Sequence, residues 1–514
     1  MRAALALLAL VLPARAGELF VSAQADPALV ADGTRARPFR SLTAALAAAR
    51  ARGWAAEVRL DVGRYDAAHG ERFPLELAPG TVIAGAGSPA CVLDGGGAVL
   101  LLRARGAGAF VLGGLTLSGA GIALAVEAPP APSTQLGLDL SDLAVTGATT
   151  GLELDLGTRE LWLGTLILRA DGLRATDCGT GLAVRGEAPL ELNLTDSLFE
   201  RCGVGLLLEA DPDEDGSKLG APDAPRYKRV HHQVELARTT FLACRESGFR
   251  RRGADGKNDG LGYRFSDCLF QENDTGIEFV RPSADSSFMI ERSRFLANTR
   301  HGLLATGLAG DPERFRLVTD SLFRWNGIGI HATCVNLELD RCRVQSNLGN
   351  GIFTANFLAE PTTTRVKNSL LTGNGASGLY GLADARLLTV ELVHCTIAAN
   401  AATGVYDKKR HAGKSQYALR GCIVAGNGED LHGLEQEQVF DSWIASFGDA
   451  GRGDPGFLAA AAGDFTLAPE SPCRGAGTAE SAALAGPLDL AGMSRPAESV
   501  DLGAFIGLHH PRPR

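Results

Sequence analysis

The sequence predicts an all-β fold, a right-handed parallel β-helix with coils of three short strands and about 22–28 residues each. A Gly-aliphatic motif recurs, and its glycines from Gly248 to Gly404 are separated by 28, 26, 27, 22, 27 and 26 residues. Short alternating apolar runs lie between these glycines without a helical period. The composition of 45% hydrophobic and 6% aromatic residues with 64 glycines fits an aliphatic core enclosed by many tight turns.

The first residues predict export. Met1 and Arg2 precede an apolar run, and Pro13 and Ala14-Arg15-Ala16 follow it, which is typical of a secretory signal peptide over residues 1–16 that is cleaved after Ala16. No later apolar run reaches the length of a membrane span. We therefore expect a secreted, periplasmic or cell-surface protein without a membrane span, and a monomer.

The ends of a solenoid require caps, because terminal coils otherwise expose strand edges and core. The Ala-rich run from Thr43 to Arg52, with Ser41 near its start, predicts a short amphipathic capping helix. We expect an N-terminal cap with the first coils over residues 17–120. The repeats then occupy residues 121–430, and the C-terminal coils and cap residues 431–514.

Two columns of polar residues recur in the coils. An Asn stands three or four residues before the glycine of successive coils, and stacked amides of this kind hydrogen-bond from coil to coil. A column of Ser, Thr and Cys predicts a small inward-facing stack, which favours buried thiols over disulfides. Bridges between adjacent coils stay open at Cys202/Cys244 and Cys395/Cys422. The Asn column comprises Asn273, Asn298, Asn326, Asn347, Asn374, Asn400 and Asn427.

Both ends of the chain carry motifs of a known family. The segment from Leu19 to Gly85, with Gly33-Thr34 and Pro38-Phe39, resembles the N-terminal domain of unknown function that opens many bacterial secreted β-helix proteins of the pectin-lyase-like superfamily. Asp454-Pro455-Gly456-Phe457 resembles the closing segment of such proteins. Because that superfamily mixes lyases, hydrolases, epimerases and non-enzymatic adhesins, the resemblance implies the fold and no single reaction.

The resemblance also implies a place for a substrate cleft, on the strand that follows the longest loop of each coil. Alternation along that strand predicts five charged side chains on its outer face. In the functional interpretation, Arg365 and Lys367 neutralise a uronate, Lys367 acts as a base, and a carboxylate is the acid partner. In the structural interpretation, which we favour, Glu338, Arg365 and Glu391 form an alternating charge ladder across adjacent strands. The carboxylates are Glu338, Asp340 and Glu391.

Two further segments bear on ligands. Lys408, Lys409, Arg410 and His411 form a basic loop that suits an anionic glycan, although most charge runs in loops are only solvated. The acidic segment 211–215 has the spacing of a calcium loop but lacks its helices and distal Glu. The sequence therefore assigns no metal-ligating residues and no certain cofactor, and it leaves calcium open.

The charge balance disfavours one class of partner. With 59 acidic against 50 basic residues, the formal net charge of −9 argues against a nucleic-acid partner. The sequence favours a protein that binds extracellular or cell-wall polysaccharide and, if catalytic, cleaves uronic-acid glycans as a lyase. The alternative is a non-catalytic surface, adhesion or structural repeat module, and the sequence does not decide whether the protein is an enzyme.

Overall fold

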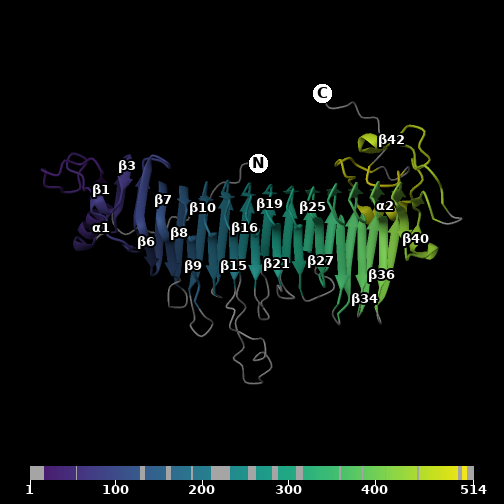
Figure 1. Cartoon of the computed structure of the whole chain (residues 1–514), viewed down its shortest axis with the longest axis horizontal. Helices are drawn as coiled ribbons and strands as arrows, with labels where there is room; N and C mark the ends of the chain where they lie inside the picture. The colour runs from purple at the N-terminus through teal and green to yellow at the C-terminus, as the bar shows by residue number, and fades with distance from the viewer. Residues whose placement is uncertain are drawn as a thin grey trace, which may run out of the picture. The chain divides into compact units, whose positions relative to one another are not determined.

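The computed structural model describes residues 17–53, 55–127, 134–157, 164–186, 189–209, 232–252, 262–280, 287–307, 316–357, 360–384, 386–410, 413–447, 451–495 and 500–505. The chain divides into two compact units, Met1–Asp213 with Val230–Val234, and Glu214–Arg229 with Glu235–Arg514. Each unit is a parallel β-solenoid of three-strand coils (Figure 1), which confirms the predicted fold class.

The first unit begins with a cap made of β1 (Glu18–Val21) and the helix α1 (Leu42–Ala51). Ser41 is the N-cap of α1, and its hydroxyl accepts a hydrogen bond from an amide of the first turn. The buried carboxylate of Glu71 accepts from two further amides of that turn, at 2.5 and 2.9 Å. The predicted capping helix is therefore present, and a second acidic cap holds it on the first coils.

The strands of the first unit form three parallel sheets. The first sheet contains β1, β2 (Glu57–Leu60), β5 (Val82–Gly85), β10 (Thr165–Asp171) and β13 (Leu190–Thr195). The second contains β3 (Gly63–Tyr65), β11 (Arg174–Thr176) and β14 (Leu198–Glu200), and the third β4 (Leu75–Leu77), β9 (Thr150–Asp155), β12 (Thr180–Arg185) and β15 (Val204–Glu209). The long strands β6 (Cys91–Arg105), β7 (Gly108–Glu127) and β8 (Gln135–Thr146) bend through more than one sheet, and a short helix η1 (Ala67–His69) precedes β4.

The second unit repeats this plan in sheets that we name A, B and C in chain order. Sheet A contains β19 (Gly262–Ser266), β22 (Ser287–Glu291), β25 (Arg316–Thr319), β28 (Leu337–Asp340), β31 (Thr362–Lys367), β34 (Leu387–Val393), β37 (Lys414–Arg420) and β40 (Val439–Phe440). Sheet B contains β17 (Thr240–Leu242), β20 (Leu269–Gln271), β23 (Arg294–Leu296), β26 (Leu322–Arg324), β29 (Arg343–Gln345), β32 (Leu370–Thr372), β35 (Thr396–Ala398), β38 (Ile423–Ala425) and β41 (Trp443–Ile444). Sheet C contains β18 (Ser247–Arg252), β21 (Thr275–Val280), β24 (His301–Thr306), β27 (Ile328–Thr333), β30 (Ile352–Asn356), β33 (Leu379–Ala383), β36 (Thr403–Lys409) and β39 (Glu429–His432), and β16 (His232–Ala237) contains residues of both units.

Left-handed residues make the corners of the second unit tight. Between sheets A and B, one residue per coil has a φ of 48–56°, and it is Asp, Arg, Asn or His in successive coils from Asp267 to His394. A second left-handed residue lies between sheets B and C, directly before each Asn of the column. The Asn itself therefore does not adopt the left-handed conformation. Its side chain points into the coil, where it forms hydrogen bonds.

The Asn column is a buried hydrogen-bonded ladder, as the sequence predicts. From Asn273 to Asn400, each side-chain amide donates to the Oδ1 of the next Asn at 2.8–3.0 Å. The same Oδ1 accepts the backbone N–H of the preceding Asn. Asp430 closes the series by accepting from Asn427 at 2.9 Å. From Asn273 to Asn400 the buried amides of each corner between sheets B and C are thus satisfied by the next coil, and those of Asn427 by Asp430 of its own coil.

Two further inward columns fill the core of the second unit. The rings of Phe241, Phe270, Phe295 and Phe323 stack with centroids 4.4–4.9 Å apart. In the Ser and Cys column, hydroxyls accept backbone amides of the preceding coil, as Ser369 does from Cys342 at 3.0 Å. All ten cysteines are buried thiols, and no disulfide joins them in the described part of the chain. Burial raises the pKa of Cys342 to about 12, so this thiol stays protonated.

The C-terminal segment folds back over the outer face of sheet B in its own unit. After β41 it contains β42 (Phe457–Ala459), the short helix η4 (Ala460–Ala462), β43 (Asp464–Leu467) and α2 (Ala479–Ala485). Another short helix, η3 (Gln436–Gln438), lies earlier, directly before β40. Phe465 and Phe505 pack on the outward side chains of Leu370 and Ala398. In these coils the outward positions of sheet B are apolar because the C-terminal segment covers them.

A buried polar network fixes this segment to the corners between sheets A and B. His394 lies between the Ser481 hydroxyl, 3.1 Å from Nε2, and the Arg495 guanidinium, 3.1 Å from Nδ1. Arg495 also donates to the Oδ1 of Asn368 at 3.0 Å. Burial, and then the charge of Arg495, lowers the pKa of His394 to about 3. His394 is therefore neutral in the folded protein.

Replacing one ladder residue tests the structural importance of the Asn column. We expect Asn347→Ala to lower the free energy of unfolding by about 3 kcal/mol, because it leaves the amides of Asn326 without their buried acceptor. Chemical denaturation measures this change. Gln345→Ala in the same coil, whose side chain is half-buried, is the control and should change stability by less than about 0.5 kcal/mol. Equal losses in both variants would contradict the assignment.

Acid should destabilise the fold through its neutral histidines. Because the pKa of His394 is depressed when folded, the unfolded chain binds the proton first, and stability falls as the pH drops below about 6.5 toward 3. His394→Asn, which keeps a side chain that tolerates the left-handed corner, should reduce the stability difference between pH 7 and pH 5 by about 2 kcal/mol. Urea unfolding at both pH values measures it, and an unchanged difference would refute the role of His394.

Candidate functional site

The predicted charge ladder lies on the outer face of sheet A. Glu338, Arg365 and Glu391 are register partners on β28, β31 and β34. Each strand places leucine or valine neighbours of these residues in the core, which forces the charged side chains outward. Lys367 occupies the next outward position of β31 and pairs in register with Asp340. The predicted outward placement of all five residues is what the structure has.

The charged side chains of the ladder, together with Lys367, pair with one another across neighbouring strands. The Nε of Arg365 lies 2.5 Å from Glu391 Oε2, and its Nη1 lies 3.1 Å from Glu338 Oε2. The Nζ of Lys367 lies 2.8 Å from the other oxygen of Glu338. Burial alone would lower the pKa of Arg365, but the hydrogen bonds to Glu391 and Glu338 outweigh it and raise the pKa above its ordinary value. Both cations are already neutralised by carboxylates of neighbouring coils.

Asp340 takes part in a different set of contacts. Its Oδ1 accepts a hydrogen bond of 2.8 Å from Asn368, and its Oδ2 forms an ion pair with Arg341. Asn368 in turn belongs to the buried network of the C-terminal segment. Asp340 thus supports the corner between sheets A and B. Its contacts are with Asn368 and Arg341, and not with the ladder carboxylates Glu338 and Glu391.

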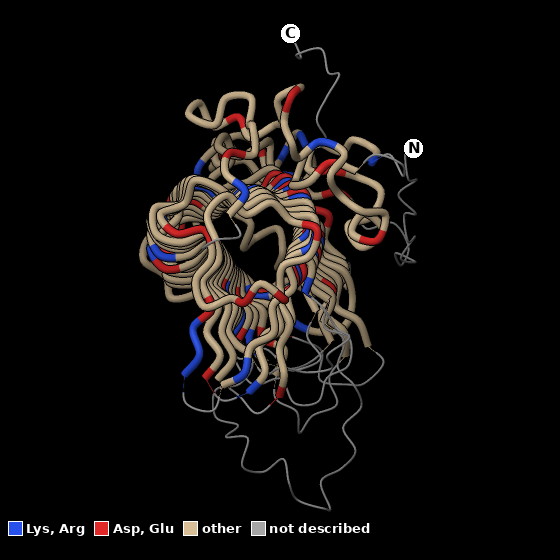
Figure 2. Tube along the Cα trace, turned by 90° about the vertical axis from the view of Figure 1, so that its right-hand side faces the viewer, with Lys and Arg blue, Asp and Glu red and all other residues tan. Residues whose placement is uncertain are grey.

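Ion pairs between consecutive coils recur elsewhere in both units. Arg292 binds both oxygens of Asp267 at 3.0 Å, and Arg341 binds Asp320 at 2.8 and 2.9 Å. In the first unit, Arg201 binds Asp177 in the same bidentate way, at 2.8 and 2.9 Å. Figure 2 shows acidic and basic residues returning at the same places of successive coils. The ladder at Arg365 follows this general pattern, which supports the strand register.

The predicted basic loop begins at the end of β36, where the chain crosses from sheet C to sheet A. The amide of Arg410 donates to the carbonyl of Ala383 at 2.8 Å, and that of Lys414 to the carbonyl of Arg386 at 3.4 Å. Two consecutive crossings are therefore stacked, and they bring together a group of cations that we call the basic crossing. It consists of Arg386, Lys408, Lys409, Arg410 and Lys414, while His411 lies outside the described residues.

Most cations of the basic crossing are not neutralised. Lys409 lies 3.4 Å from the carboxylate of Asp407, which is buried and also accepts a hydrogen bond of 2.6 Å from Ser415. Arg386, Lys408, Arg410 and Lys414 form no ion pair with a carboxylate among the residues that the structure describes. All but Lys408 are exposed. The basic crossing is therefore a local site of positive potential.

A row of rings on the outer face of sheet C escaped the sequence analysis. The rings of His331, Phe353, Tyr380, Tyr406 and His432, here called the ring stack, have successive centroids 4.6, 5.5, 4.8 and 4.4 Å apart. The signal was present, because four of these rings stand two residues after the glycine of the repeat motif.

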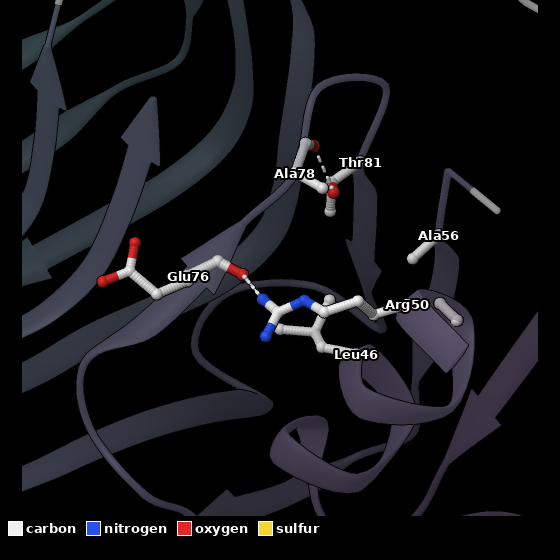
Figure 3. Close-up of a pocket in the computed structure, with 7 residues that line it drawn as sticks. Leu46, Arg50, Ala56, Glu76, Ala78 and Thr81 are labelled. Carbon is white, nitrogen blue, oxygen red and sulfur yellow. Dashed lines mark hydrogen bonds between the residues drawn. The ribbon is translucent and has the colours of Figure 1, made fainter. Parts of the chain in front are cut away.

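A small pocket lies in the N-terminal cap of the first unit. It opens between α1 and the strands β4 and β5, and Leu46, Arg50 and Thr81 are among its lining residues (Figure 3). Arg50 reaches across it to the carbonyl of Glu76 at 3.5 Å. The pocket is a gap in helix packing and contains no paired titratable groups suited to acid–base chemistry.

The described residues contain no candidate metal site. No group of three or more His, Cys, Asp or Glu side chains in these ranges is arranged to hold a metal ion. The acidic segment 211–215, which left calcium open, lies outside the described residues. No helix within the same ranges is long and apolar enough to cross a membrane.

One family model matches the sequence, over residues 28–127. It is described as "Protein of unknown function (DUF1565)". The match overlaps the segment whose motifs resemble an N-terminal domain of unknown function, and it confirms that resemblance for this part of the chain. The sequence matches no curated protein.

Three solved structures illustrate the remaining similarity. The periplasmic alginate epimerase AlgG is 9% identical with a TM-score of 0.36, over 67% of this chain and 76% of that chain. The A-module of the Azotobacter vinelandii mannuronan C-5 epimerase AlgE4 is 16% identical with a TM-score of 0.33, over 84% of this chain and 100% of that chain. The Dettilon tailspike protein is 13% identical with a TM-score of 0.36, over 81% and 68%. Similarity at these values says nothing about the reaction or ligand of this chain.

The charge ladder makes a prediction about stability. Arg365→Gln should lower the free energy of unfolding by about 1 kcal/mol, because it leaves Glu338 and Glu391 without their shared cation on a partly solvated face. The loss should shrink when salt is added, since salt screens the remaining repulsion. Urea denaturation at low and high ionic strength measures both effects, and a variant as stable as the parent would show that the ladder does not support the register.

Proposed function

We propose that this protein binds an anionic polysaccharide at the basic crossing of its second unit. The observation that carries the proposal is the gathering of Arg386, Lys408, Arg410 and Lys414 at one edge without carboxylate partners in the described ranges. The chain as a whole has a formal net charge of −9. A cluster of cations without ion-pair partners, on a chain whose net charge is negative, favours a negatively charged ligand at that place.

The solenoid supports a polymeric ligand. Successive coils are about 4.8 Å apart, so equivalent side chains form rows that a linear chain can follow. A carboxylated glycan with one charge per sugar carries its charges more sparsely than double-stranded DNA, which has one per about 1.7 Å of helix axis. Such a glycan is therefore less strongly repelled by the acidic remainder of the protein. An exported location, as the N-terminal sequence predicts, would place the protein beside such polymers.

Cleavage is not part of the proposal. A lyase needs a cation that is available to the substrate carboxylate and a base that can take a proton. Arg365 and Lys367 are instead bound to Glu338 and Glu391 of the neighbouring coils. The non-catalytic binding module is therefore the interpretation that this geometry supports, and lyase activity is an outcome that the experiment below also detects.

A pair of charge-matched variants tests the proposal. Binding of the purified protein to alginate, polygalacturonate and neutral dextran is measured by titration calorimetry at two salt concentrations. We expect binding to an acidic polymer that weakens with salt, and about a tenfold loss of affinity in Lys408→Gln/Arg410→Gln. Arg365→Gln/Lys367→Gln removes the same charge from the paired ladder and should bind like the parent protein.

The outcomes separate the competing functions. Absence of binding to every acidic polymer would contradict the proposed function, and equal weakening in both variants would contradict the assigned place. Ultraviolet absorbance from unsaturated uronate, absent in Arg365→Gln/Lys367→Gln, would instead establish a lyase at the charge ladder.

A further inference from the structure

The ring stack faces outward along the second unit. Four of its rings, from His331 to Tyr406, are partly exposed, and the side chain of His432 at the end of the row is 45% exposed. The four strand pairings from β27 to β39 keep the rings in register, one per coil. The row therefore runs across the strands, in the direction in which the coils succeed one another.

The fold does not require aromatic rings at this position. Earlier coils of the same unit have Arg250, Glu278 and Leu304 there, in the same register and with the same strand pairing. Stacked rings between strands do stabilise a sheet, so a structural role is the competing explanation. That explanation accounts for the rings but not for polar groups on their outer edges.

The hydroxyl groups of Tyr380 and Tyr406 distinguish the stack from packing alone. Neither phenol forms a hydrogen bond with another described residue. Lys408 follows Tyr406 by two residues on β36 and so lies on the same outer face. The amide of Arg410 donates at 2.8 Å to the carbonyl of Ala383, the last residue of the strand that carries Tyr380. Burial raises the pKa of Tyr380, and the positive charge of Arg410 opposes this shift. The stack thus continues into the basic crossing.

Stacking limits how the rings can meet a ligand. The rings of Tyr380 and Tyr406 are inclined by only 3°, and those of Tyr406 and His432 by 8°, so neighbouring rings cover most of each other's faces. What remains accessible is a row of apolar edges with two hydroxyls. Such a surface offers hydrogen bonds and apolar contact at intervals of one coil, about 4.8 Å, which is similar to the length of one sugar unit.

We propose that the anionic polysaccharide lies along the ring stack, across the strands, with one sugar per coil. The hydroxyls of Tyr380 and Tyr406 bind sugar oxygens, and Lys408 and Arg410 bind the acidic groups of the same chain. This inference rests on the proposed function and specifies its ligand as an extended uronate-type glycan of several units. The basic crossing supplies attraction, and the ring stack supplies the register.

Removal of the hydroxyls alone tests the inference, because Tyr380→Phe/Tyr406→Phe keeps the rings and their stacking. We expect this variant to bind acidic oligosaccharides about tenfold more weakly, with an unchanged midpoint of urea unfolding. In the parent protein, affinity should rise with oligosaccharide length up to about five units and then level off. Thr306→Val removes a hydroxyl from the outer face of β24, in the coil before the ring stack begins at His331, and is the matched control.

Each pattern of results has one meaning. Weaker binding in Lys408→Gln/Arg410→Gln with normal binding in Tyr380→Phe/Tyr406→Phe would overturn this inference and leave the proposed function intact. Weaker binding only in the tyrosine variant would overturn the role of the basic crossing and support the ring stack as the site. No binding of any acidic oligosaccharide would overturn both, and equal weakening by Thr306→Val would overturn the assignment to the tyrosines.

Saturation-transfer NMR gives a second readout, which reports the parts of the oligosaccharide that lie against the protein. Irradiation of the aromatic protons of the parent protein should transfer magnetisation to the bound oligosaccharide along its length. Transfer confined to one end unit, or the same transfer in Tyr380→Ala/Tyr406→Ala, would overturn the proposed path of the chain.

Discussion

The coil-to-coil hydrogen bonding of buried amides is the constraint on which the rest of the second unit depends. Each Asn of the ladder satisfies the corner of its neighbour, through contacts of 2.8–3.0 Å between side chains. An unsatisfied amide at these buried corners would cost more than most surface contacts supply. The ladder therefore fixes the register of three sheets together, and every outward side chain inherits its place from it.

Fixed register turns a repeat into rows of equal spacing. On sheet A one row consists of alternating charges, Glu338, Arg365 and Glu391, in which the arginine pairs with both carboxylates. On sheet C a row became the ring stack, which shares β33 and β36 with the basic crossing, whose cations except Lys409 have no such partners in the described ranges. Only the second kind of row leaves groups available to a ligand. The basic crossing is therefore better suited to bind a ligand than the charge ladder is.

The C-terminal segment shields part of the outer face of sheet B from solvent. It covers the outer face of sheet B and is held by the neutral His394 between Ser481 and Arg495. The closing motifs predict a C-terminal cap, but they do not indicate the face of the solenoid that the cap covers. The apolar outward positions at Leu370 and Ala398 were the available signal, and alternation alone does not say what covers them.

The sequence by itself determined the coil, the inward columns, the capping helix and the outward direction of the ladder residues, because these follow from local alternation and from the spacing of one repeat. It also located the cations from Lys408 to Arg410. Tertiary structure decided which charges neutralise each other, that Asp340 belongs to a corner, and that rings from Phe353 to His432 form one row. Those facts depend on contacts between residues more than twenty positions apart, and the unequal loops between coils obscure such contacts in the sequence.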